Sequence, residues 1–299
     1  MTALLQAWAF LWGAVWGSFL NVVIYRMPLG LSLVRPGSRC GACGTPIRWY
    51  DNIPILSYLV LRGRCRACGE GYGPRYMLVE AACGVLGLAL FDKIVLPLDP
   101  DSFVPAMLTW MWLQAFVYAL VALTFIDLNH YYIPDEISLP MIAVGVVGAF
   151  FVPVADPVAH VLGAASAGLF MVSLSGISWL VFRREALGLG DAKLLALIGA
   201  FVGWRALPFV LFASAMQALA ATGLARLYTR ITGKANPLTL TTEELDAHFG
   251  EADRFAAAGS HTVVPYGPFL ALAGLEALLF GDALLWDLID AITRRLAGA

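Results

Sequence analysis

Long apolar stretches recur along the whole sequence and restrict the folds open to it. A helix that crosses the hydrocarbon core of a bilayer needs roughly 20 mainly apolar residues. Eight windows meet or approach this requirement, near residues 4–24, 77–97, 103–126, 137–154, 158–182, 190–205, 207–228 and 265–288. Hydrophobic residues make up 60% of the chain and charged residues 13%, whereas soluble domains are about 45–50% apolar and about 25% charged. We therefore expect an all-α polytopic membrane protein with about eight transmembrane helices.

The positions of the basic residues predict the orientation of these helices. Eight Arg lie between the first two windows, whereas the next loop holds Asp99 and Asp101 and neither Lys nor Arg. Because cytoplasmic loops carry an excess of Lys and Arg, the first loop is expected to be cytoplasmic. Alternation then places fifteen of the 19 basic residues on that side and both termini outside, with Arg294 and Arg295 among the four exceptions.

Two polar stretches, residues 26–76 and 230–263, interrupt the apolar pattern. We interpret residues 1–25 as the first transmembrane helix, 26–76 as a small cytoplasmic loop and 77–299 as a transmembrane domain with a polar insertion at 230–263. The loop has too little apolar periodicity to build a core without a metal or disulfide staple. The insertion has the composition of a solvated amphipathic helix or linker.

Four of the five cysteines form two near-copies of one unit, RCGACG with Cys40 and Cys43, and RCRACG with Cys65 and Cys68. Each pair is spaced to place two thiolates on one ion, and the Gly after it permits the turn. The 21 residues between the pairs slightly exceed the usual range of about 15–20 for such sites. We expect a structural zinc knuckle with no open coordination position. Two disulfides are the alternative, which a reducing cytoplasm disfavours, and a redox C-x-x-C lacks its βαβ context.

Placing a carboxylate in or beside a membrane span costs free energy, so such residues indicate functional sites. Asp127 ends the third window in FIDLNHYYIPD, and Asp191 opens the sixth in GLGDAK. Both map to the cytoplasmic membrane boundary, where they can meet. Two adjacent carboxyls disfavour double ionisation, so one keeps a proton while the other activates water. This is the acid and base that amide hydrolysis needs.

The residues around Asp191 can support such a pair. Gly188 and Gly190 permit close approach of a neighbouring helix or a substrate strand, and Lys193 adds positive charge nearby. From the residues alone, a Gly-x-Gly-Asp at a helix start is also typical of an N-cap. The sequence contains neither H-E-x-x-H nor G-x-S-x-G, the signatures of zinc and serine hydrolases.

Several segments together resemble the type IV prepilin peptidase family, also called leader peptidases. They are GSFLNVVIYRMP, the cysteine segment from PGSRCGACG to GRCRACG, RYMLVE, the two aspartate segments and PYGPFLAL at 265–272. The resemblance covers nearly the whole chain. It implies that Asp127 and Asp191 are catalytic, and that the short basic leader of type IV prepilins and type II secretion pseudopilins is cleaved at the cytoplasmic face.

The resemblance also implies methylation of the new N-terminus with S-adenosylmethionine, with residues 26–76 as the associated zinc loop. No residue can be assigned to the methyl donor. We expect a multi-pass protein of the bacterial inner membrane with its active site facing the cytoplasm, in contact with the lipid bilayer and with no nucleic-acid partner. Glu80 and Glu185 are candidates to bind the basic leader. The alternatives are a zinc-capped transporter that relays protons through carboxylates such as Glu276, and a methyltransferase without peptidase activity.

Overall fold

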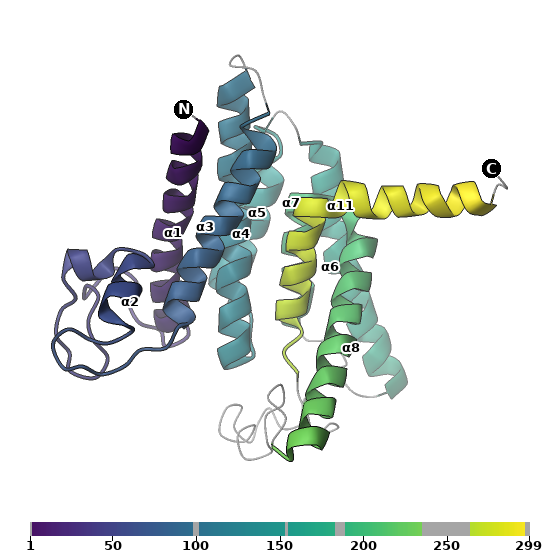
Figure 1. Cartoon of the computed structure of the whole chain (residues 1–299). Helices are drawn as coiled ribbons and strands as arrows, with labels where there is room; N and C mark the ends of the chain where they lie inside the picture. Colours follow the sequence, from purple (N-terminus) through teal and green to yellow (C-terminus); the bar gives the residue numbers. More distant parts are fainter. Residues whose placement is uncertain (1, 98–101, 153–154, 183–188, 235–263, 297–299) are drawn as a thin grey trace. The chain divides into compact units, whose positions relative to one another are not determined.

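The computed structural model describes residues 2–97, 102–152, 155–182, 189–234 and 264–296. Regular secondary structure in this part of the chain is helical (Figure 1), as the sequence predicted. The chain divides into two compact units, one made mainly of Met1–Ile126 and the other of Asp127–Phe151 and Ala155–Ala299. The last turn of helix α4, which carries Asp127, therefore belongs to the second unit.

Each of the eight apolar windows forms a helix. They are α1 (Thr2–Arg26), α3 (Arg75–Ile94), α4 (Phe103–His130), α5 (Asp135–Gly148), α6 (Pro157–Phe182), α7 (Leu189–Val202), α8 (Leu207–Thr232) and α11 (Gly267–Leu296). Helices satisfy their own backbone hydrogen bonds, which a bilayer core requires. In the described residues, α1, α4, α6 and α8 are long and apolar enough to cross a membrane.

The two shortest of these helices are α5 and α7, with 14 residues each. At 1.5 Å per residue each is about 21 Å long, less than the ~30 Å hydrocarbon core. Helix α7 ends at Val202, Gly203 follows with φ of 78°, and a 3-10 turn over Trp204–Ala206 leads directly into α8. The tight connection expected between the sixth and seventh windows is thus present.

In the first unit, α1 and α3 pack antiparallel. The Gln6 side chain donates to Asp92 Oδ1 at one end (3.0 Å), and Asn21 Nδ2 donates to the Tyr76 carbonyl at the other (3.0 Å). Helix α4 joins them through buried Trp110, whose indole N–H donates to the Gly87 carbonyl at 3.0 Å. These bonds satisfy polar groups that would otherwise face hydrocarbon.

In the second unit, α7 is surrounded by α5, α6 and α11, and it is buried from Ala192 to Phe201 except at Lys193. Helices α6 and α7 approach most closely at Gly163 and Gly199, where a Cβ on either would lie within 2.4 Å of the other's carbonyl oxygen. Helix α8 meets α11, and Gln217 Nε2 donates to Glu276 Oε2 at 2.7 Å. Because α7 is the central helix, its first turn brings Asp191 close to several neighbouring helices.

Candidate functional site

Asp127 is a buried carboxyl near the end of α4. The residue is 6% exposed, and its carboxyl lies with Ile133 against Gly267. The helix ends three residues later, and Tyr131 then takes a left-handed conformation with φ 56°. The carboxyl oxygen Oδ2 accepts the backbone N–H of Gly267 at 3.1 Å. Burying a carboxyl costs free energy, and the amide holds this one in a fixed orientation. Both features are expected of a reactive group.

Asp191 lies in the first turn of α7 and is only partly exposed. The preceding Gly190 packs on Ile133, which also lies against Gly267. Ile133 therefore contacts the neighbours of both aspartates. The end of α4 and the start of α7 thus place the two aspartates around Ile133, within the second unit.

Two residues at this site, Tyr266 and Gly267, were not predicted to take part in it. The Tyr266 hydroxyl hydrogen-bonds with Ser214 Oγ at 2.7 Å, and its ring is close enough for an electrostatic interaction with Asp191. Gly267 begins α11, and a Cβ there would lie 2.6 Å from Asp127 Oδ2. Both residues lie in the segment PYGPFLAL. This segment supported the family resemblance, but the sequence assigned no role to any residue in it.

The residues that were predicted to support the site lie in different parts of the structure. Lys193 forms an ion pair with Asp135, which links the first turns of α7 and α5. Glu80 lies in the first unit, where its carboxylate accepts the backbone N–H of Ile55 at 2.7 Å. This bond ties the cysteine loop to α3. Glu185 and Gly188 lie outside the described residues.

The four cysteines of the loop converge as the spacing predicted. The Sγ atoms of Cys40, Cys43, Cys65 and Cys68 all lie within 4.8 Å of one another, and those of Cys40 and Cys68 are 3.9 Å apart. A tetrahedral zinc with Zn–S bonds of about 2.3 Å requires sulfurs about 3.8 Å apart. The donor set and its spacing therefore fit one closed zinc site, and the free thiols argue against disulfides.

The two knuckles have the same backbone turn. In each, the amide of the first Cys donates to a carbonyl five residues on, and the Gly four residues on donates back to that Cys. These glycines, Gly44 and Gly69, have φ of 69° and 75°. The conformation is open to Gly without strain, which confirms the expected role of the Gly in each copy.

The electrostatics of the thiols also favour a bound cation. Hydrogen bonds from the Thr45 hydroxyl and amide lower the pKa of Cys43 to about 6, and the amides of Cys68 and Ala67 lower that of Cys65. The pKa of Cys68 rises to about 12, because desolvation and the other three thiols outweigh the bond from the Glu70 amide. Four thiolates together need a metal ion to offset their repulsion.

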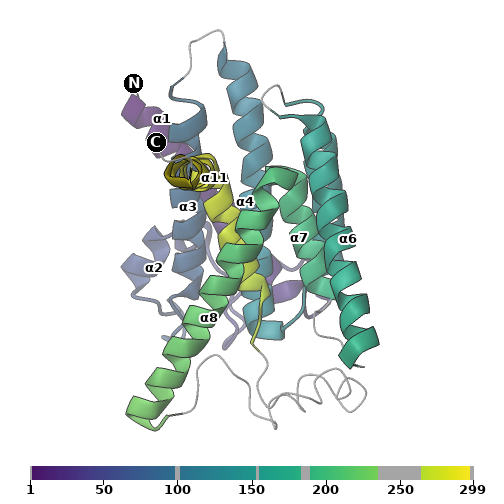
Figure 2. The same cartoon turned by 90° about the vertical axis from the view of Figure 1, so that its right-hand side faces the viewer.

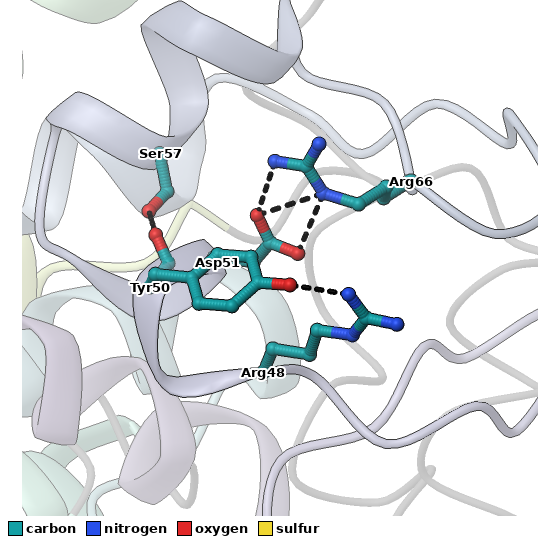
Figure 3. Close-up of polar contacts among 5 residues, drawn as sticks. All are labelled: Arg48, Tyr50, Asp51, Ser57 and Arg66. Atoms are coloured by element: carbon teal, nitrogen blue, oxygen red, sulfur yellow. Dashed lines mark hydrogen bonds and ion pairs between the residues drawn. The ribbon is translucent and has the colours of Figure 1, made fainter.

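A polar network fastens the second knuckle to the rest of the loop (Figure 3). Arg66, which lies between Cys65 and Cys68, binds Asp51 through Nε and Nη2, the shortest contact being 2.6 Å. Its guanidinium also lies 5.7 Å from the centre of the Tyr50 ring. The Tyr50 carbonyl in turn accepts the Ser57 hydroxyl at 3.2 Å. A bidentate Arg–carboxylate pair adds geometric specificity to the metal centre.

Helices of membrane-spanning length, a four-cysteine knuckle and two aspartates at adjoining helix ends define a polytopic membrane protein with a candidate hydrolytic site. The bacterial peptidase A24 N-terminal domain matches residues 11–94, and the type IV leader peptidase family matches residues 114–223. The chain belongs to the type IV leader peptidase family.

Three relatives illustrate the similarity, each named a prepilin leader peptidase/N-methyltransferase. The protein of Myxococcus xanthus is 38% identical, over 99% of this chain and 96% of its own length. That of Pseudomonas putida is 33% identical over 90% and 88%, and that of Klebsiella pneumoniae is 40% identical over 67% and 86%. No solved structure matches the chain significantly.

The metal centre yields a prediction about zinc content. Purified, reduced protein should contain one zinc per chain, and Cys65→Ser should lose most of it, because three thiolates hold zinc less tightly than four. Cys83→Ser is the matched control, since Cys83 is buried in α3 and is not part of the cluster. Elemental analysis by mass spectrometry measures the ratio. Metal-free wild-type protein, or a Cys65→Ser variant with full zinc, would reject the site.

Proposed function

We propose that this chain is an aspartic endopeptidase of the bacterial inner membrane that removes the short basic leader from type IV prepilins and type II secretion pseudopilins. The relatives' names support both leader cleavage and N-methylation. The observation that carries the catalytic assignment is the buried Asp127 carboxyl, held by the Gly267 amide, with Gly267 and Gly190, the neighbour of Asp191, both packed on Ile133.

The proposed mechanism uses the two carboxyls as one acid–base pair. With one aspartate ionised and one protonated, the carboxylate takes a proton from water, whose oxygen attacks the scissile carbonyl carbon. The protonated carboxyl donates to the carbonyl oxygen, giving a tetrahedral diol. Collapse of this diol breaks the C–N bond, and the amine leaves with a proton from the carboxyl that became protonated in the first step. No covalent enzyme intermediate forms.

Residues around the pair have proposed supporting roles. The Gly267 amide fixes the orientation of the Asp127 carboxyl, and positional accuracy of this kind is a large part of catalysis. The Lys193–Asp135 ion pair neutralises a cation that would otherwise repel a basic leader beside Asp191. We keep Gly188 and Gly190 as positions where a substrate backbone approaches, and Glu80 and Glu185 as partners for leader Lys and Arg.

The second proposed activity is methylation of the N-terminus that cleavage exposes. S-adenosylmethionine is the expected donor, because the relatives are named N-methyltransferases. When bound, it would supply a methyl group to the α-amine of the processed substrate. We assign no residue of the described chain to the donor, and we propose that the zinc loop, residues 26–76, supports substrate docking or this transfer.

Orientation follows from charge. Six Arg in the loop between α1 and α3, with Arg26 and Arg75 at the adjoining helix ends, support a cytoplasmic location for the loop and for the aspartate pair, which maps to the same membrane boundary. The transporter alternative loses its support, since the family is that of leader peptidases and Glu276 is hydrogen-bonded to Gln217. The same family assignment argues against a methyltransferase that lacks peptidase activity.

The acid–base pair predicts the effect of single amide substitutions. Asp127→Asn and Asp191→Asn should each lower the rate of leader removal by at least ~10²–10⁴-fold, the usual worth of a general acid or base. Asp92→Asn serves as the control, because Asp92 is a polar partner of Gln6 in the first unit. The assay incubates purified protein with a prepilin and scores leader loss and methyl incorporation separately. Near-normal turnover by either site variant would reject the assignment.

Gly267→Ala should impair cleavage without unfolding the protein. The added Cβ would lie 2.6 Å from Asp127 Oδ2, so the carboxyl must move, and a shift of about 1 Å can cost ~10²-fold in rate. Gly281→Ala on the same helix is the matched control, because the nearest atom to its Cβ is 3.7 Å away. Comparable cleavage rates for the two variants would show that this amide does not position Asp127.

A further inference from the structure

An apolar stripe runs along one side of the loop between α1 and α3. It begins in the 3-10 turn Trp49–Asn52 and continues through helix α2 (Leu56–Leu61). Trp49 is 81% and Val60 65% exposed, and the other members of the stripe, Ile53, Leu56 and Leu59, are also exposed. Exposed apolar side chains gathered in this way usually mark a binding surface.

The opposite side of α2 holds it on the loop. Ser57 is buried and donates to the Tyr50 carbonyl at 3.2 Å. Tyr58 packs edge-on against Tyr72, with 5.5 Å between the ring centres, and lies over Gly63. The stripe is therefore presented outward by fixed contacts.

The position of α2 along α3 places the stripe at the level of the membrane boundary. The Ile55 amide at the start of α2 donates to Glu80 Oε2 at 2.7 Å. Glu80 lies five residues into α3, about 7–8 Å along the helix axis. Figures 1 and 2 both show α2 beside the loop-proximal ends of α1 and α3, and not beyond them. A helix at this depth beside a membrane span meets the headgroup layer and the outer hydrocarbon.

Basic residues border the stripe on both sides. Arg48 precedes it, and Arg62 and Arg64 follow it directly. Arg48 donates to the Tyr50 hydroxyl, whereas Arg62 and Arg64 are exposed and form no ion pair within the described part of the chain. Apolar and aromatic side chains flanked by Arg are typical of segments that lie in the membrane interface.

We propose that this stripe, Trp49 with Ile53, Leu56, Leu59 and Val60, docks into the lipid leaflet on the loop side of the membrane, with Arg62 and Arg64 binding the phosphates of anionic lipids. The proposal commits to lipid because α2 is bonded to α3 beside the loop-proximal end of that helix and because the flanking charge complements an anionic surface. It rests on the cytoplasmic orientation proposed above only for the identity of that leaflet.

Lipid docking gives the loop a third anchor besides its zinc and the Glu80 bond. The zinc fixes the two knuckles to each other, and Glu80 fixes α2 to α3. Contact with the leaflet then holds the outer side of the loop at the depth where a membrane-bound substrate presents its N-terminal segment. Loop position should accordingly depend on the lipid headgroup.

The test uses a photoreactive benzophenone amino acid in the full-length protein, at Val60 in one variant and at Glu70 in the other. Glu70 is exposed on the second knuckle, outside the stripe, so it is the matched control. Both proteins are placed in nanodiscs of phosphatidylcholine with or without phosphatidylglycerol, illuminated, and analysed by mass spectrometry. Zinc content confirms that each variant is folded.

Lipid adducts several-fold more abundant at position 60 than at position 70, and increased by phosphatidylglycerol, are the expected result. Adducts at position 60 confined to protein, from this chain, a second copy or a substrate, would overturn the proposal, as would the lack of lipid adducts there. Equal yields in the two lipid mixtures would overturn the role of Arg62 and Arg64. The yield of lipid adducts does not require cleavage, so this result can contradict the lipid proposal without contradicting the proposed function.

Discussion

The hydrogen bond from the Gly267 amide to the Asp127 carboxyl joins the end of α4 to the start of α11, across 140 residues of sequence. A carboxyl group buried among apolar side chains is tolerated only when it is hydrogen-bonded or neutral, and bonds to charged groups contribute about 1.5–3 kcal/mol. The same contact fixes which way the carboxyl faces. With Ile133 packed against Gly190 and Gly267, this bond holds the last turn of α4 against the start of α11, within the second unit.

The cysteine loop is held in its conformation by a different set of interactions. Its exposed apolar side chains cannot form a core, so its order depends on the metal, the Asp51–Arg66 pair and the Glu80–Ile55 bond. Each copy of the turn supplies two cysteine ligands, which explains why the duplicated unit fits one metal ion with four ligands. A site of this type has no open position for chemistry. We therefore propose that the loop contributes rigidity and that the aspartates contribute the reaction.

Sequence patterns predicted features that depend on local spacing. In the described part of the chain, hydropathy located the eight apolar helices, because the thickness of the bilayer sets their length, and the C-x-x-C-Gly unit predicted both the cluster and its left-handed glycines. Contacts between distant segments left no periodic signal, so the bonds of Gly267 to Asp127, Tyr266 to Ser214 and Gln217 to Glu276 were not anticipated. Glu80 was expected at the substrate because an intramembrane carboxylate indicates function, yet its observed partner is the backbone of Ile55. The polar insertion lies almost wholly outside the described residues.

The central claim is that Asp127 and Asp191 act on one peptide bond as a single unit. A double-mutant cycle on the rate of leader removal tests it most directly, with wild type, both Asn single variants and the double variant assayed on the same prepilin. Groups that act as a unit are strongly non-additive, so the account predicts that the double variant is no slower than the slower single variant. A double variant whose loss equals the product of the two single losses would show independent roles and contradict the account.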